Sequence, residues 1–104
     1  MNFSYILIGQ TVVPEPDAQA WAEWRVQAFK THANRVARTT IPGGFVSTVF
    51  TGLDTSCGMG LSTLFETMVI IDDNEYLKVT CGTWAEAEAQ HKTVVQECKT
   101  LLSA

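Results

Sequence analysis

The chain has 104 residues, of which 46% are hydrophobic and only 17% are charged, and its formal net charge at pH 7 is -4. This length predicts a single domain, 1–104, that can bury one core without metal or disulfide support. The negative charge argues against bulk binding of nucleic acid or of an anionic membrane surface. The apolar run at 5–8 is too short to span a bilayer.

The cysteines indicate a reducing compartment. Cys57, Cys81 and Cys98 are odd in number, lie far apart and form no Cys-x-x-Cys pair. This spacing is typical of free thiols and not of a disulfide framework or a zinc site. We therefore expect a cytoplasmic protein, in the host cell if a phage encodes it, with no metal and no cofactor.

The first third of the chain predicts a strand and a helix. Residues 3–13 are rich in β-branched and aromatic side chains, which favour one strand that ends at the prolines of 14–16. Asp17 is a typical N-cap residue for a helix over 18–33.

Two predicted hairpins follow the helix. Residues 34–41 and 45–54 flank a Pro-Gly-Gly turn and are expected to pair antiparallel. A strongly apolar strand over 64–71 turns at 72–75 into a further strand over 76–81.

The chain is predicted to end in a helix over 84–102, opened by the Thr-x-x-Glu capping box of Thr83 and Glu86. The order β-α-β-β-β-β-α predicts an α+β fold, with a mostly antiparallel sheet of about five strands and two helices on one face.

Both faces of the predicted sheet are apolar. Alternating residues along 45–53 and 64–71 place hydrophobic side chains on each side. Because two helices on one side leave the other side in water, we expect a homo-oligomer that buries the second face. The alternative is that the N-terminal strand or the glycine loop at 55–60 folds over that face.

His91 falls inside the apolar stripe of the last helix. A buried imidazole must find a hydrogen-bond partner, so a structural histidine is the first interpretation. A ligand-facing or acid–base role is the alternative. A metal site is not expected, because no second histidine or cysteine stands at ligand spacing.

Glu66 is an acidic residue in the middle of an apolar strand. A carboxylate there needs a cation or several donors, and Arg35 or Arg38 on the same sheet is the expected partner. The alternative is that Glu66 positions a ligand together with Arg38 and Thr67.

The glycine loop begins no helix, so it lacks the setting of a phosphate-binding loop and is interpreted as a mobile connection or lid. Asp54 before it is expected to form a turn, with a ligand contact as the alternative. Cys57 has no signature of a nucleophile.

Three segments resemble a group of small uncharacterised proteins of tailed phages and prophages. Val46 to Asp54 resembles that group's VSTVFLGLD, Leu64 to Val69 its LFETMV, and Thr83 to His91 its closing TWxEAExxH. The segment 35–39 also resembles the stretch that precedes VSTVF in the group. The resemblance implies a phage accessory protein but no particular activity.

Four of the seven basic residues lie within 25–38, beside the polar residues above. The first functional hypothesis is therefore a non-enzymatic accessory protein, with counter-defence as one such role, that binds a small anionic ligand such as a signalling nucleotide. The expected ligand-binding residues are Arg35, Arg38, Thr48, Asp54, Glu66, Thr67 and His91. The alternatives are a protein that blocks a host protein by surface contact and a small hydrolase or lyase that uses His91.

Overall fold

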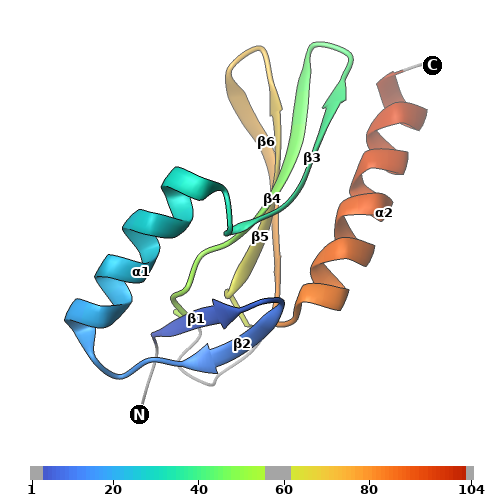
Figure 1. The fold of residues 1–104 in the computed structure, drawn as a ribbon. Coiled ribbons are helices and arrows are strands. Elements are labelled where there is room, and N and C mark those ends of the chain that lie inside the picture. The colour runs from blue at the N-terminus through green and yellow to red at the C-terminus, as the bar shows by residue number, and fades with distance from the viewer. Residues whose placement is uncertain (1–3, 56–61, 103–104) are drawn as a thin grey trace.

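The computed structural model describes residues 4–55 and 62–102, which form an α+β fold with two helices and six strands (Figure 1). In chain order the elements are β1 (Tyr5–Ile8), β2 (Thr11–Pro14), α1 (Ala18–Thr31), β3 (Arg35–Ile41), β4 (Gly44–Phe50), β5 (Phe65–Ile71), β6 (Asn74–Cys81) and α2 (Trp84–Leu102). The predicted loop at 55–60 lies outside the described residues except for its first residue.

The N-terminal segment is a hairpin, so the prediction of one strand over 3–13 is wrong. β1 pairs antiparallel with β2, and Ile8 lies opposite Thr11. Gly9 stands in the turn with a φ of 63°, a conformation that glycine adopts without the steric cost of a Cβ. The hairpin is a two-stranded sheet of its own, which corrects the expected single sheet of about five strands.

The other strands form an antiparallel sheet in the order β3-β4-β5-β6. Asp72 and Asp73 connect β5 to β6, and their φ values of 51° and 63° are those of a tight type I′ hairpin turn. Because this turn needs only two residues, β6 begins at Asn74 and not at the predicted start of 76–81.

β4 ends at Phe50, four residues before the predicted end of that strand at Asp54. The chain bends at Gly52, whose φ is 77°. The carbonyl oxygen of Gly52 accepts hydrogen bonds from the backbone nitrogen of Tyr5 at 2.8 Å and from Trp21 Nε1 at 2.9 Å. The bend therefore ties the N-terminal hairpin and α1 to the end of the sheet.

Both helices begin where the sequence predicts. Asp17 Oδ1 accepts from the backbone nitrogens of Gln19 at 3.0 Å and Ala20 at 3.2 Å. Thr83 Oγ1 accepts from the backbone nitrogen of Glu86 at 3.2 Å and donates to its Oε1 at 3.0 Å. Such side-chain bonds satisfy backbone N–H groups that the first helical turn leaves unpaired.

The two helices do not share a face of the four-stranded sheet, because α2 covers one face and α1 lies at one end of the sheet, which corrects the prediction of two helices on one face. α2 contacts all four strands, whereas α1 contacts β1 and stands apart near the lower end of the sheet (Figure 1). Trp24 of α1 packs edge-on against Phe50 at a ring-centroid distance of 5.6 Å. α1 ends at Thr31, because His32 adopts the left-handed conformation with a φ of 61°.

The core lies between the sheet and α2, on what we call the covered face. Its buried strand residues are Ile41, Val46, Thr48, Phe50, Phe65, Thr67 and Val69, and α2 adds Ala87, His91 and Val94. The opposite side, the open face, carries half-buried side chains, which from β4 and β5 are Phe45, Ser47, Val49, Glu66, Met68 and Ile70. The open face therefore has an apolar centre with charged residues around it.

Candidate functional site

The residues predicted to form one ligand site are divided between the two faces of the sheet. On the covered face are Thr48, Thr67 and His91; on the open face are Arg35, Arg38 and Glu66; in the segment after β4 is Asp54. Glu66 and Thr67 are neighbours in β5, so their side chains point in opposite directions. A single site that contains all seven residues is therefore not formed.

His91 is the centre of a buried polar network on the covered face. It is 5% exposed, and its Nδ1 and Nε2 lie 2.8 Å from the hydroxyl oxygens of Thr48 and Thr39 respectively. Thr48 Oγ1 lies 2.7 Å from Thr67 Oγ1. Gln90 Nε2 donates to Thr67 Oγ1 at 3.0 Å. The network thus connects three strands to α2.

Both ring nitrogens of His91 are occupied by these hydroxyl groups. A neutral imidazole suits the arrangement, because one nitrogen donates while the other accepts. Burial lowers the pKa of His91 below its ordinary value, which favours the neutral form. Among the residues described, every buried side-chain nitrogen or oxygen has a hydrogen-bond partner. The geometry fits the structural interpretation of His91 and leaves neither ring nitrogen for a substrate.

Glu66 forms an ion pair with Lys78. The prediction that its partner is Arg35 or Arg38 is therefore wrong. Glu66 Oε1 lies 3.6 Å from Lys78 Nζ. β6, which carries Lys78, is adjacent to β5, whereas β4 separates β5 from the arginines of β3. The guanidinium of Arg38 lies over the ring of Phe45 instead, 4.0 Å from its centroid.

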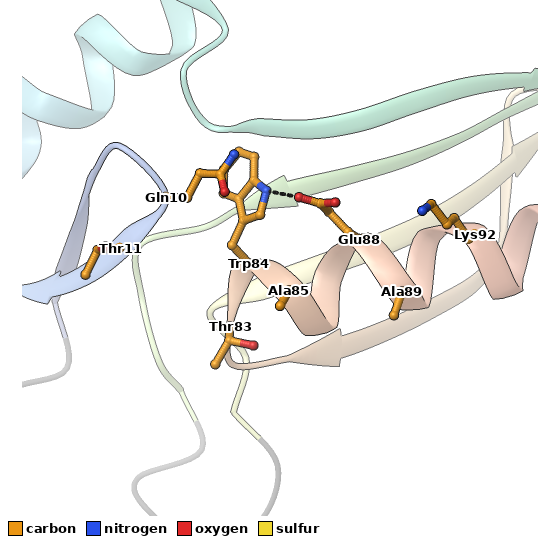
Figure 2. A pocket seen from close by; sticks show the side chains of 8 residues that line it. All are labelled: Gln10, Thr11, Thr83, Trp84, Ala85, Glu88, Ala89 and Lys92. Carbon is orange, nitrogen blue, oxygen red and sulfur yellow. Dashed lines mark hydrogen bonds between the residues drawn. The ribbon is translucent and has the colours of Figure 1, made fainter.

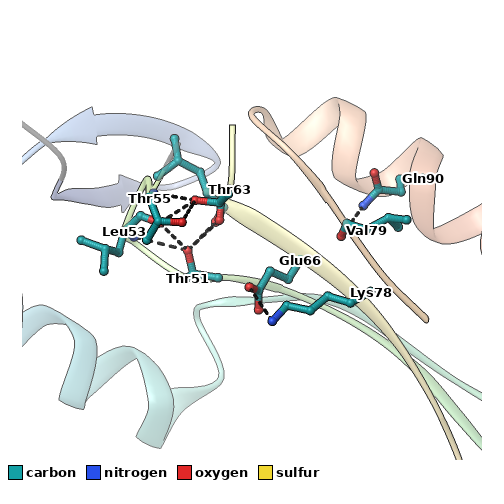
Figure 3. Close-up of polar contacts among 9 residues, drawn as sticks. Thr51, Leu53, Thr55, Thr63, Glu66, Lys78, Val79 and Gln90 are labelled. Atoms are coloured by element: carbon teal, nitrogen blue, oxygen red, sulfur yellow. Dashed lines mark hydrogen bonds and ion pairs between the residues drawn. The ribbon is translucent and has the colours of Figure 1, made fainter. Parts of the chain in front are cut away.

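A hollow of about 400 Å³ lies where the open face meets α1, and we call it the cation pocket. Its lining includes two cations, Arg25 and Lys78, one carboxylate, Glu66, and four threonines, Thr51, Thr55, Thr63 and Thr80. Figure 3 shows the ion pair beside the cluster of threonines, with α1 running below. The pocket therefore joins three separate parts of the chain.

Hydrogen bonds among the threonines hold the wall of the cation pocket (Figure 3). Thr51 Oγ1 donates to the carbonyl oxygen of Thr63 at 3.0 Å. The backbone nitrogen of Thr55 donates to Thr63 Oγ1 at 2.7 Å, and that hydroxyl donates to the carbonyl oxygen of Leu53 at 3.2 Å. These bonds tie the segment after β4 to the segment before β5.

Arg25 reaches the cation pocket from α1, where aromatic rings support it. Its guanidinium carbon lies 4.9 Å from the centroid of the Trp21 ring and 5.7 Å from that of Phe29. Trp21 is itself fixed, because its Nε1 donates to the carbonyl oxygens of Tyr5 at 3.1 Å and Gly52 at 2.9 Å. Cation–π contacts of this kind stabilise a guanidinium at a defined position.

Sequence reasoning missed both cations of this pocket as site residues. Arg25 belongs to the basic cluster in 25–38, but the arginines predicted to bind were Arg35 and Arg38. Lys78 carries no local signal, because its position beside Glu66 follows from the pairing of β5 with β6.

A larger hollow, of about 540 Å³, lies between the β1–β2 turn and the start of α2. Figure 2 shows its wall, where Trp84 Nε1 donates to Glu88 Oε1 near Gln10, and Lys92 stands further along the helix. Glu88 and Lys92 are its charged lining residues and their charges cancel. This hollow is larger than the cation pocket but has no excess of either charge.

The described residues provide no activated thiol and no metal site. Burial, together with the charge of Glu86, raises the pKa of the Cys81 thiol. Burial, together with the charge of Glu97, raises that of Cys98. In the part of the chain that the structure describes, no three His, Cys, Asp or Glu residues gather as metal ligands would. Cys57 lies outside that part.

Comparisons with known proteins add no identity. No protein-family model, no curated protein and no solved structure matches the chain. Neither helix in 4–55 and 62–102 has the length and apolar character needed to cross a membrane.

Proposed function

We propose that this protein is a non-enzymatic binding protein for a small anionic ligand, which it holds in the cation pocket. The observation that carries the proposal is the convergence of Arg25 and Lys78 on one hollow with threonine hydroxyl groups around it. A guanidinium offers a planar pair of donors that matches carboxylate or phosphate oxygens. The volume of about 400 Å³ is within the usual range for small-molecule sites.

The charge of the pocket supports an anion over a cation. Two positive groups and one carboxylate line it, although the whole chain carries a net charge of -4. A local positive field in an acidic protein concentrates anions at that place. Glu66 competes with the ligand for Lys78, since the two side chains already form an ion pair.

Binding is better supported than catalysis. His91 is buried with both ring nitrogens hydrogen-bonded, and it lies on the opposite face of the sheet from Glu66. The raised pKa values of Cys81 and Cys98 favour the protonated thiol, which is a poor nucleophile. A hydrolase that uses His91 with Glu66 or a cysteine lacks support from this arrangement.

The ligand class we propose is a phosphate-bearing metabolite, with a signalling nucleotide as the first candidate. The resemblance of the chain to small phage and prophage proteins supports an accessory role in which such a nucleotide is sequestered. Sequestration needs affinity and no turnover, which agrees with a site that has cations but no activated base.

Thermal unfolding in the presence of inorganic phosphate, nucleoside monophosphates and cyclic dinucleotides tests this function. A ligand at ten times its dissociation constant stabilises the folded state by about 1.4 kcal/mol, which raises the melting temperature by about 5–10 °C for a domain of this size. No shift with any of these anions at millimolar concentration would refute the proposal.

Three substitutions locate the site. Arg25→Gln removes the guanidinium and is expected to abolish the shift. Arg38→Gln is the matched control, because Arg38 stacks on Phe45 outside the lining of the cation pocket, and it should keep the full shift. Glu66→Gln removes the competing carboxylate and should tighten binding. Loss of binding in Arg38→Gln with binding intact in Arg25→Gln would place the ligand elsewhere.

A second function, contact with another protein, is favoured by one observation on α1. Val26 and Phe29 are 55% and 59% exposed on this helix, and neighbouring exposed apolar residues are typical of a protein contact. If a purified host protein binds the chain, Val26→Ser should weaken that complex without changing anion binding. An unchanged complex would exclude this surface.

A further inference from the structure

β6 is one of the two edge strands of the four-stranded sheet, and β3 is the other. Among the residues that the structure describes, β6 pairs with β5 on one side and with no strand on the other. An edge strand presents unpaired backbone N–H and C=O groups that can pair with another chain. The edge at β6 is therefore a surface on which a further strand can add.

Large apolar side chains surround this edge. Tyr76 and Leu77 of β6 and Leu101 and Leu102 of α2, which we call the edge patch, line one hollow of about 260 Å³. Tyr76 is 65% exposed and Leu101 76%. The edge patch supplies half of the eight large apolar residues that the described chain exposes.

A β-bulge sets the direction of the side chains along β6. The register with β5 shifts between Leu77 and Glu75, which leaves Tyr76 as the extra residue. Glu75 and Lys78 therefore both belong to the open face, where Lys78 meets Glu66. Tyr76 and Leu77 both line the hollow beneath α2. The strand thus carries a charged pair on one face and an apolar pair on the other.

We propose that a second copy of this chain pairs antiparallel with β6 about a two-fold axis between Tyr76 and Leu77. In this register Glu75 lies opposite Lys78 of the second copy, and the reciprocal pair forms across the axis. Tyr76 likewise lies opposite Leu77 of the second copy. The pairing joins two four-stranded sheets into one and brings the two edge patches together.

The match of opposite charges and of apolar side chains across the axis specifies the register of the two strands and favours a second copy of this chain as the partner. If the register between the two copies slips by one residue, Lys78 lies opposite Tyr76 in one direction and Glu75 lies opposite Leu77 in the other. A slip of two residues in the first direction sets Lys78 opposite Leu77. Each slip places a charge against an apolar side chain, so the pairing is strongly specified. A strand that matches itself in both charge and hydrophobicity fits a two-fold dimer, because such an interface uses the same surface twice.

Sedimentation of the full chain at about 1–100 µM tests the proposal, since this range spans dissociation constants typical of modest interfaces. We expect a dimer at the upper end. Lys78→Glu and Glu75→Lys each place like charges opposite one another twice, and each should weaken the dimer by at least about tenfold. The double variant Glu75→Lys/Lys78→Glu restores opposite charges and should recover dimerisation.

Two controls keep the result specific. All variants of this series also carry Glu66→Gln, which removes the ion pair between Lys78 and Glu66 within one copy. The charge changes at Glu75 and Lys78 then act only on the contact between the two copies. Lys30→Glu makes the same charge change on exposed α1 and should leave the dimer unchanged. Far-UV circular dichroism verifies that each variant is folded.

Each outcome decides the matter. Weakened single variants with a restored double variant support the pairing at β6. A monomeric wild type at 100 µM, single variants that dimerise like the wild type, or a double variant that stays monomeric would each overturn it. The dimer and the anion-binding function share Lys78, and Arg25→Gln distinguishes them, because it should abolish ligand binding while leaving the dimer intact.

Discussion

Thr48→Val tests how much the buried network beneath α2 contributes to stability. Thr48 is fully buried at 0% exposure, and its hydroxyl oxygen lies 2.7 Å from that of Thr67 and 2.8 Å from His91 Nδ1. Valine has nearly the same shape as threonine but cannot make either hydrogen bond. The substitution therefore removes two bonds without opening a cavity.

The expected loss follows from the number of bonds and from what each partner retains. A buried hydrogen bond contributes about 1 kcal/mol net, and an unpaired buried polar group costs more. Thr67 keeps the bond from Gln90, whereas His91 Nδ1 is left without a partner. We expect Thr48→Val to lower the free energy of unfolding by about 2–3 kcal/mol. The melting temperature should fall by about 10–20 °C.

Urea unfolding followed by far-UV circular dichroism measures this loss. The midpoint should fall while the slope with urea concentration stays unchanged. Thr93→Val is the matched control, because Thr93 is exposed on α2, and it should stay within about 0.5 kcal/mol of the wild type. A Thr48→Val protein as stable as this control would refute the assigned role of the network.

Three further predictions concern the same fold. Burial lowers the folded-state pKa of His91, so as the pH falls the unfolded chain takes up a proton at this histidine before the folded chain does. The contribution of His91 to stability is therefore full above a pH of about 6.5. Below that pH the free energy of unfolding falls by at most about 1.4 kcal/mol per pH unit. Urea titrations should show that His91→Gln removes this component; an unchanged slope would contradict it. Thr83→Ala should cost about 1 kcal/mol by loss of the helix cap, and equal stability would show that the cap is dispensable. Gly9→Ala should lower the free energy of unfolding by about 1 kcal/mol. This loss comes from the positive φ alone, because an added Cβ would meet nothing within 4 Å. A calorimetric melting temperature equal to that of the wild type would argue against the hairpin turn.

The elements that the sequence predicts well are those with local signals. The cap at Asp17 and the capping box at Thr83 both agree with the structure, because each depends on residues close in the chain. The pairing of β3 with β4 and of β5 with β6 also agrees, since a short turn joins the two strands of each hairpin.

One error concerns a local signal, and the others concern features decided by distant contacts. Gly9 in the middle of an apolar segment was not interpreted as a turn, although an isolated glycine in a strand pattern is a recognised break signal. The position of α1 at the end of the sheet depends on Trp24 packing on Phe50 and on the hydrogen bonds of Trp21 to Tyr5 and Gly52. No periodicity within the helix encodes these contacts.

The predicted site residues are divided between the two faces of the sheet, which also follows from how distant parts of the chain are arranged. Alternation along β5 could have shown that Glu66 and Thr67 point to opposite faces. The partner of Glu66 required the strand order, which places β6 and its Lys78 beside β5. Arg25 reaches the same pocket only because α1 lies beside this end of the sheet.

The most direct test of the anion-binding function is a nuclear magnetic resonance titration of the isotope-labelled chain with inorganic phosphate and then with a nucleoside monophosphate. The account predicts saturable shifts in the side-chain Nε–H signal of Arg25 and in the backbone amide signals of Thr55 and Lys78. The corresponding signals of Arg38 and His91 should not move. Shifts confined to Arg38, or no saturable shift at Arg25, would contradict it.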